Sequence, residues 1–181
     1  MPRSSFLVCA VVLGAAFFAL SAQAPQPVPT PPATSSADCP LPEADTHKFL
    51  SSAAIDVAAP RGRLALVPVT TEAARERGLM CVVRVPLDRG MIFVFAPPER
   101  PQGFWMKNTL VSLDMVFVTS AGIVSTVAAN VPATQRGTAD NAVARRAGLA
   151  QYVIELAAGD AARHGIVHGT KLALPTLTAA E

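Results

Sequence analysis

The stretch 110–127 reads LVSLDMVFVTSAGIVSTV and contains two strand-like runs on either side of a turn. The runs 110–118 and 123–127 are rich in β-branched and aromatic residues, and 120–122 between them is Ser-Ala-Gly. A connection this short joins antiparallel strands, because parallel strands need a crossover of a dozen or more residues. The stretch therefore predicts an antiparallel β-hairpin.

Further strands are expected on both sides of this hairpin. The unbroken apolar run 91–95 predicts a strand covered on both faces. Residues 64–69 also read as a strand, and Pro68 favours an edge strand or a strand end because proline donates no hydrogen bond. Two more strands are expected at 152–156 and 171–174.

The segments between these strands predict little further structure. Residues 104–107 read as the return of the chain after a turn at 96–102, leading directly into the 110–118 strand. The polar stretch 130–150 is interpreted as a mobile surface loop.

Two short helices complete the expected fold. A helix begins after Thr70 or Thr71 and ends at Gly78, which supplies a left-handed stop. A single helical turn is expected over 160–164. Since strands outnumber helices and lie close together, we expect an α+β domain that is mainly antiparallel, with the sheet curled into a small barrel or sandwich and two short helices on its outside.

Changes in composition and the positions of proline and small residues divide the chain of 181 residues into four parts. Residues 1–24 combine a basic residue, an apolar run and small residues, as in a signal peptide, although 6–22 would also serve as an uncleaved inner-membrane anchor. Residues 25–38, with five prolines in 25–37, read as a disordered linker, and 39–63 as an N-terminal extension. The globular domain is expected at 64–175. We therefore expect an exported protein, periplasmic or secreted.

Charge and cysteine content narrow the class of protein further. The formal net charge is only +2, which gives no electrostatic basis for nucleic-acid binding. Without the leader two cysteines remain, Cys39 and Cys81, and export would allow a disulfide between them. The alternative is a buried free Cys81 with an unpaired Cys39.

Several short strings resemble the domain of unknown function 192 family over 64–174. They are Arg77-Gly78-Leu79-Met80, Pro86 with Asp88, Gly90-Met91-Ile92-Phe93, Phe104-Trp105-Met106-Lys107-Asn108-Thr109, Leu113-Asp114 followed by Phe117, Gly122-Ile123, Glu155-Leu156, Gly159, and Gly165-Ile166 before Gly169. The resemblance implies a small, often exported bacterial or archaeal domain without an established activity. Gly78, Met80, Gly90, Met91 and Phe104 are therefore expected to be structural residues of the motif. Val82 and Thr170 stand where the family usually has an arginine and an aspartate.

The most specific string suggests a candidate site. Asp114 lies inside an apolar strand, where a carboxylate needs hydrogen-bond donors. Lys107, Asn108 and Thr109 are the nearest donors in sequence, so they and Asp114 form either a structural clasp or the rim of a ligand pocket. In the pocket interpretation Trp105 supplies an aromatic face, Lys107 a cation, and Asn108 and Asp114 hydrogen bonds.

Metal and catalytic signatures are weak. Met80, Met91, Met106 and Met115 with Cys81 offer soft ligands for Cu(I), but scattered methionines are usual in cores. His164 and His168 are separated by Gly165, which argues against a zinc site on one helix face. We therefore predict no metal and no cofactor.

The functional hypothesis is a binding or accessory module that recognises a small polar ligand or a peptide at the 104–114 hairpin. The expected partner is that ligand or an envelope protein, and a membrane is contacted only through an uncleaved leader. One alternative is an envelope hydrolase or transferase that uses Lys107 and Asp114 as an acid and base. The other is a purely structural or interaction protein.

Overall fold

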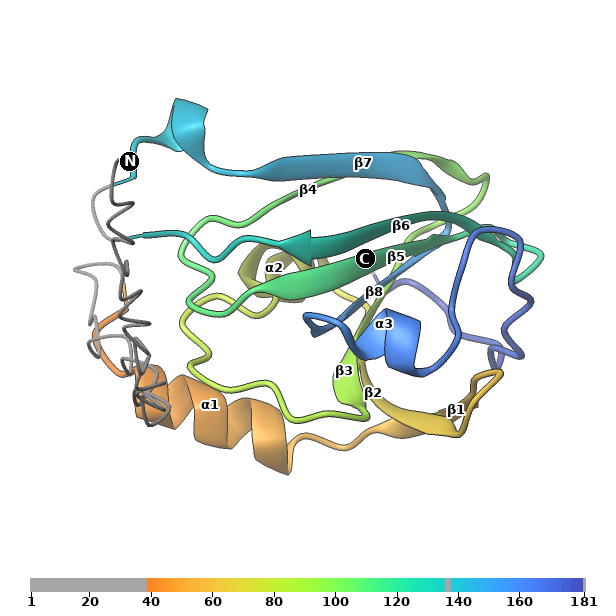
Figure 1. Cartoon of the computed structure of the whole chain (residues 1–181), viewed down its shortest axis with the longest axis horizontal. Helices are drawn as coiled ribbons and strands as arrows, with labels where there is room; N and C mark the ends of the chain where they lie inside the picture. The colour runs from red at the N-terminus through yellow and green to blue at the C-terminus, as the bar shows by residue number, and fades with distance from the viewer. Residues whose placement is uncertain (1–38, 136–137, 181) are drawn as a thin grey trace, which may run out of the picture. The chain divides into compact units, whose positions relative to one another are not determined.

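The computed structural model describes residues 39–135 and 138–180. The predicted signal peptide or anchor and the predicted linker lie outside the described residues. Six strands form one sheet in the order β1-β2-β3-β8-β5-β6 (Figure 1). Their bounds are Ile55–Ala58 (β1), Arg63–Val69 (β2), Arg89–Val94 (β3), Leu113–Val118 (β5), Val124–Val131 (β6) and Tyr152–Ala157 (β8). The sheet is mostly antiparallel, and it is curled but not closed, so the fold is α+β as predicted.

One pair of neighbours in this sheet is parallel. β2 and β3 run in the same direction, because α2 (Glu72–Arg77) and the loop after it carry the chain back between them. The mainly antiparallel sheet expected from the sequence is thus observed, with this parallel pair as an exception that the sequence analysis did not identify. Pro68 lies at the end of β2, beyond the residues that pair with β1, so its expected place at a strand end is confirmed, although β2 as a whole is not an edge strand.

A second sheet has two strands, β4 (Arg100–Trp105) and β7 (Arg145–Ala150), which pair antiparallel (Figure 1). The sequence analysis assigned 130–150 to a surface loop, and β7 corrects that interpretation. The 104–114 segment is not a hairpin either, because β4 pairs with β7 while β5 pairs with β6 and β8. The predicted 110–127 hairpin is confirmed as β5 and β6.

The large sheet is buried on both faces, and each face has its own core. One core lies on the side of β4 and β7 and contains Phe93, Leu113, Met115, Phe117 and Val153. The other lies on the side of α3 (Asp160–Arg163) and contains Leu66, Ile92, Val116, Ile154 and Leu156. Because the two sets alternate along each strand, the unbroken apolar runs of the sequence reflect burial of both faces.

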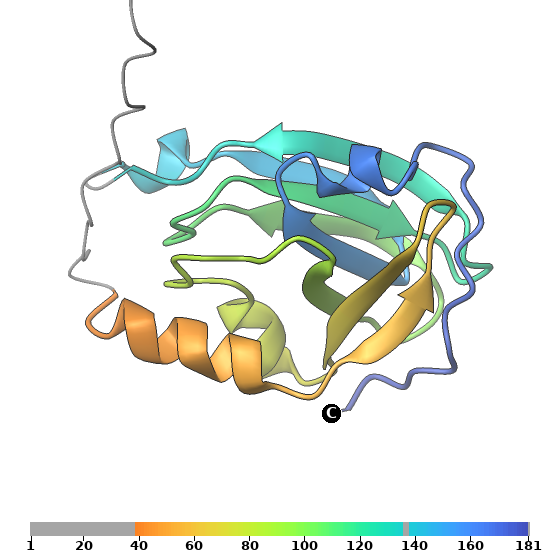
Figure 2. The same cartoon turned by 60° about the horizontal axis from the view of Figure 1, so that its bottom comes forward.

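In the described part of the chain, three α-helices lie on the outside of the sheet. α2 begins where the hydroxyl of Thr71 accepts the N–H of Ala74 at 3.3 Å, and it ends at Gly78 with a φ of 46°. α1 (Pro42–Ser51), in orange in Figure 2, was not predicted; it belongs to the segment interpreted as an extension. Phe49 of α1 is buried in the core beside β4 and β7.

A disulfide joins Cys39, just before α1, to Cys81, just after α2. The final segment, expected as a strand at 171–174, makes only an isolated bridge between Lys171 and Ile123. It then runs beside the β1–β2 hairpin (Figure 2). In the part of the chain that the structure describes, no helix has the length and apolar character needed to cross a membrane.

Candidate functional site

Asp114 lies in β5 with no exposed surface. Its Oδ1 accepts the backbone N–H of Asn130 at 2.8 Å, and its Oδ2 accepts that of Ala161 at 2.9 Å. Both oxygens therefore bind backbone donors from β6 and α3, and neither uses the donors of the 107–109 turn. The expected burial of Asp114 is observed, but its expected partners are not.

The turn residues have other partners. The ammonium of Lys107 forms an ion pair with Asp140. Asn108 adopts a left-handed φ of 51°, and its carbonyl accepts the N–H of Cys81 at 2.9 Å. This turn therefore fastens the segment after α2 in place, and it does not meet Asp114.

Trp105, at the end of β4, is 40% exposed. The guanidinium of Arg145, its neighbour across the β4–β7 pair, lies 5.0 Å from the centre of the indole ring. This separation is typical of a cation–π contact. Trp105 therefore has an exposed aromatic surface, and the cation beside it is Arg145 and not Lys107.

A pocket of about 300 Å³ lies between α2 and β4. Its walls include Gly78, Met80, Phe93, Phe95, Phe104 and Trp105, and Glu155 of β8 also lines it. The Phe104 ring stands edge-on to Phe93 with 4.9 Å between centroids, and edge-on to Phe95 at 6.2 Å. We call this space the Glu155 pocket; four aromatic side chains line it.

Glu155 is the unusual residue of this pocket. It is 5% exposed and lies between Met91 of β3 and Met115 of β5 in the sheet register. No hydrogen-bond partner for its buried Oε2 is present among the described residues. Burial among these apolar neighbours raises the pKa of Glu155 to about 8. At neutral pH the carboxyl is therefore largely protonated and can donate one hydrogen bond.

The approach of the backbone to this carboxyl depends on Gly78. A Cβ at that position would lie 3.2 Å from Cζ of Phe93 and 3.7 Å from Oε2 of Glu155. The left-handed φ also favours glycine. The glycine that ends α2 thus brings the end of the helix close to the buried acid.

Charged residues of α2 line the mouth of the Glu155 pocket. They are Glu72, Arg75, Glu76 and Arg77, and their formal charges sum to zero. Arg75 is held by the carbonyl of Val94 at 3.1 Å and lies 5.4 Å from the Phe95 ring centre. Arg77 pairs with Asp45 of α1 at 2.5 Å. The mouth on the α2 side therefore favours neither sign of ligand charge.

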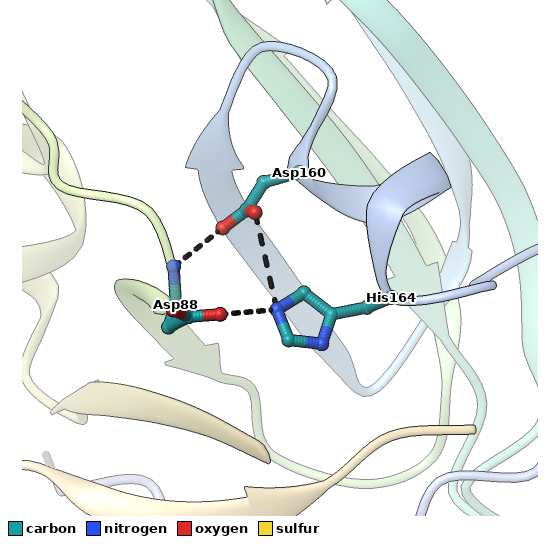
Figure 3. A group of neighbouring side chains, drawn as sticks. All are labelled: Asp88, Asp160 and His164. Atoms are coloured by element: carbon teal, nitrogen blue, oxygen red, sulfur yellow. Dashed lines mark hydrogen bonds and ion pairs between the residues drawn. The ribbon is translucent and has the colours of Figure 1, made fainter. Parts of the chain in front are cut away.

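A second group of polar side chains joins the loop before β3 to α3. Figure 3 shows Asp88, Asp160 and His164 pointing toward one another. Oδ2 of Asp160 accepts the backbone N–H of Asp88 at 2.9 Å, and Nε2 of His164 lies 2.8 Å from Oδ1 of Asp88. Nδ1 of His164 donates to the carbonyl of Arg61 at 2.6 Å. The three side chains offer a carboxylate, carboxylate and imidazole set that a metal ion can use.

The guanidinium of Arg163 already occupies this group. It bonds Asp88, and its Nε donates to Oδ1 of Asp160 at 2.8 Å. The hydrogen bond from Arg163 is the largest cause that lowers the pKa of Asp88 below its usual value. A metal ion would have to displace this cation from both carboxylates, so the group is best described as an ion-pair network that fastens α3 to the sheet.

Sequence reasoning singled out Trp105, Lys107, Asn108 and Asp114, and the structure brings none of the last three into the Glu155 pocket. It missed Glu155 as a site residue. The available signal was a single acid at the centre of the apolar strand Tyr-Val-Ile-Glu-Leu. Of the methionines weighed as copper ligands, Met106 and Met115 are fully buried in the core.

The fold and the pocket define a small α+β domain with a buried carboxylic acid facing a cavity. The family model for DUF192, described as an uncharacterized ACR, matches residues 57–174. The chain therefore belongs to this family, as its sequence strings suggested.

Two solved structures are similar to the chain. One is a protein of unknown function from Novosphingobium aromaticivorans DSM 12444, with 31% identity and a TM-score of 0.55, covering 66% of this chain and 82% of the other. The second is described as a "putative transcription regulator" from Sinorhizobium meliloti 1021, with 32% identity and a TM-score of 0.53, covering 65% and 88%. No curated protein matches the chain.

Proposed function

We propose that this domain is a binding module that takes a small polar ligand, or one side chain of a peptide, into the Glu155 pocket. The observation that carries the proposal is the carboxyl of Glu155, which is buried, has an unpartnered Oε2 and faces a cavity of about 300 Å³. A buried polar atom without a partner costs stability, and a ligand that hydrogen-bonds to it recovers that cost. This volume lies at the small end of the usual range for ligand sites.

The surroundings of Glu155 favour an uncharged ligand group. A protonated carboxyl donates a hydrogen bond to a carbonyl or hydroxyl oxygen, and the rings of Phe93, Phe95 and Phe104 pack on an apolar stem. The charged side chains of α2 that line the pocket have balanced charges. Binding of an uncharged group is therefore expected to weaken above about pH 8, where Glu155 loses its proton.

The alternative of catalysis by Lys107 and Asp114 has little geometric support. Both oxygens of Asp114 are engaged by backbone N–H groups in the core, and Lys107 is paired with Asp140 on a different surface. A general acid and base must reach the same substrate atoms. Binding is therefore the better-supported proposal.

We also propose that the protein is exported, to the periplasm or beyond. The Cys39–Cys81 disulfide is compatible with an oxidising compartment, where such bonds persist. Cell fractionation with thiol alkylation tests this proposal. Recovery of the chain in the cytoplasm with both thiols free would contradict it.

The single tryptophan of the sequence, Trp105, lines the pocket and provides a direct test of binding. A panel of monosaccharides and N-acetyl amino-acid methylamides is titrated against the protein, and Trp105 fluorescence is recorded. At least one compound should change the fluorescence saturably. The Glu155→Gln substitution should lower the affinity for that compound tenfold or more. Glu43→Gln, an exposed substitution on α1, is the matched control. Equal affinity for the wild type and Glu155→Gln would overturn the proposal.

A further inference from the structure

The pairing of β4 with β7 determines which backbone groups of β4 remain available. Met106 donates to the carbonyl of Ala144 at 3.0 Å, in line with the β4–β7 register, which pairs Phe104 with Arg146. In an antiparallel pair, hydrogen-bonded residues alternate with residues whose N–H and C=O groups point to the opposite edge. The backbone groups of Gly103 and Trp105 therefore point away from β7.

Among residues 39–135 and 138–180, no strand lies next to this second edge of β4. β4 and β7 form a sheet of two, and among the described residues the backbone of Gly103 and Trp105 makes no hydrogen bond to a turn or loop. A Cβ built at Gly103 would meet no atom within 4 Å, so the face of β4 at this position is also open, and no side chain is packed over the strand there. Exposed edges are usually blunted by charged residues or proline. Here Pro101 has no N–H to donate at one end of the edge, and the backbone groups from Gly103 to Trp105 remain available for pairing with another chain.

The same residues line the Glu155 pocket. Gly103, Phe104 and Trp105 form its β4 side, opposite α2. An extended chain added at this edge would run along the mouth of the pocket, with alternate side chains pointing inward and outward. The hydrogen-bonding edge and the unpartnered carboxyl are thus arranged for one ligand.

We infer that the Gly103–Trp105 edge binds an extended peptide segment of a partner protein as an added β-strand, with one uncharged polar side chain, Asn or Gln, in the Glu155 pocket. The inference rests on the proposed function and specifies its ligand class. Main-chain hydrogen bonds supply affinity in this mode of recognition, and a pocket for one side chain supplies specificity. The short edge limits pairing to about three residues of the partner.

Two arginines define the preferred charge of that peptide. Arg145 and Arg146 of β7 border a shallower hollow that shares Gly103, Phe104 and Trp105 with the Glu155 pocket. Within residues 39–135 and 138–180, neither arginine has an ion pair with a carboxylate. We therefore expect an acidic residue next to the side chain that enters the pocket.

The test uses a phage library of random dodecapeptides selected on the full chain purified from cells. A recovered peptide is synthesised, and its affinity is measured by Trp105 fluorescence. The peptide amides are N-methylated one at a time. Methylation at every second position, where the amide bonds β4, should lower the affinity tenfold or more, and methylation at the positions between should lower it less than twofold. Equal losses at all positions would overturn strand addition.

A substitution in β4 tests the same hydrogen bonds from the other side. Gly103→Pro removes an N–H that points away from β7, and it should bind the peptide at least tenfold more weakly than Gly103→Ala, which keeps that N–H. Circular dichroism checks that both variants fold. If Gly103→Pro does not fold, the N-methylated peptides alone test strand addition. Equal affinity of the two folded variants would overturn the inference.

The remaining outcomes separate this inference from the proposed function. If no peptide is recovered while small compounds still require Glu155, strand addition is wrong and the pocket proposal stands. If neither compounds nor peptides bind, both are wrong. A dimer of the chain that Gly103→Pro abolishes would show that the edge binds a second copy, which also overturns the peptide inference.

Discussion

The backbone N–H of Ala161 in α3 donates to the carboxylate of Asp114 in β5 at 2.9 Å, across 47 positions of sequence. The other carboxylate oxygen accepts Asn130 in β6, where that strand shifts register against β5. One buried acid thus holds the start of a helix and an irregular part of a strand. It is the kind of buried charge that is tolerated because each oxygen has a donor.

Asp114→Asn should destabilise the domain by about 2–4 kcal/mol. The amide keeps one acceptor oxygen, but its NH₂ group faces a second backbone N–H, which is left without a partner. Urea unfolding followed by circular dichroism measures the change. Lys107→Ala is the control, because an exposed ion pair contributes about 1 kcal/mol or less. A larger loss from Lys107→Ala than from Asp114→Asn would contradict the role of Asp114 in holding β6 and α3 to β5.

Glu155 should make the domain less stable as pH rises. Its folded-state pKa of about 8 lies above the ordinary value of 4.5, so the folded state binds more protons than the unfolded state between these values. The free energy of unfolding must then fall across that window and level off above pH 8. At about 1.4 kcal/mol per pH unit, the free energy of unfolding should decrease by a total of the order of 5 kcal/mol.

Glu155→Gln should remove this slope and raise the free energy of unfolding at pH 8 by about 2–4 kcal/mol. The measurement is urea unfolding at intervals from pH 5 to pH 9, with Glu43→Gln as the exposed control. A variant that is more stable and yet fails to bind ligand would indicate that the acid is kept for function at the expense of stability. An unchanged slope in Glu155→Gln would show that another group is responsible.

The parts of the fold that were predicted are those encoded locally. The β5–β6 hairpin follows from the turn at 120–122, and α2 follows from Thr71 and Gly78. β7 was missed because its inward positions include Gly148 and Ala150, which carry little apolar signal. A Cβ at Gly148 would lie 2.6 Å from the Phe117 ring, so the small residue is needed for packing. Only the partner strand reveals this need.

The site was predicted less well than the fold. Asp114 was identified as a buried acid, but its donors come from residues 16 and 47 positions away in sequence. Nearest donors in sequence are a poor guide in a sheet, where strands pair at long range. Glu155 lines the same pocket as Phe104 and Gly78, which come from the second sheet and from the end of α2 and are distant in sequence. α1 did leave a signal, since Pro42 at its start and Lys48 in its last turn are typical of helix ends.

Reduction of the Cys39–Cys81 disulfide should lower the free energy of unfolding by about 4 kcal/mol, the chain-entropy value for a loop of this length. The bond closes a loop over a sequence separation of 42, and it joins the start of α1 to the segment after α2. Urea unfolding with and without dithiothreitol measures the change. Cys39→Ser should already show the loss and should not respond to dithiothreitol. An equal response in both proteins would indicate that the reductant acts elsewhere.

Arg163→Gln should raise the pKa of Asp88 toward its ordinary value, because the hydrogen bond from Arg163 is the largest cause of its lowering. A depressed folded-state pKa stabilises the protein above the unfolded pKa, and this contribution is lost as pH falls. The variant should therefore show a weaker loss of stability on acidification. NMR titration of the Asp88 carboxyl carbon gives the pKa, and Arg84→Gln is the exposed control. An Asp88 titration unchanged by Arg163→Gln would contradict the ion-pair network.

Two glycines in strands should respond oppositely to alanine. A Cβ at Gly90 of β3 would lie 2.1 Å from the backbone oxygen of Glu155, and strand backbone cannot move away without breaking the β3–β8 pairing. Gly90→Ala should cost about 3 kcal/mol or more, or prevent folding. Gly103→Ala meets open space and should change stability by less than about 1 kcal/mol, in the stabilising direction because glycine is unfavourable within strands. Thermal unfolding of both variants tests the pair. A Gly90→Ala protein as stable as the wild type would show that β3 and β8 are not packed as closely as this contact requires.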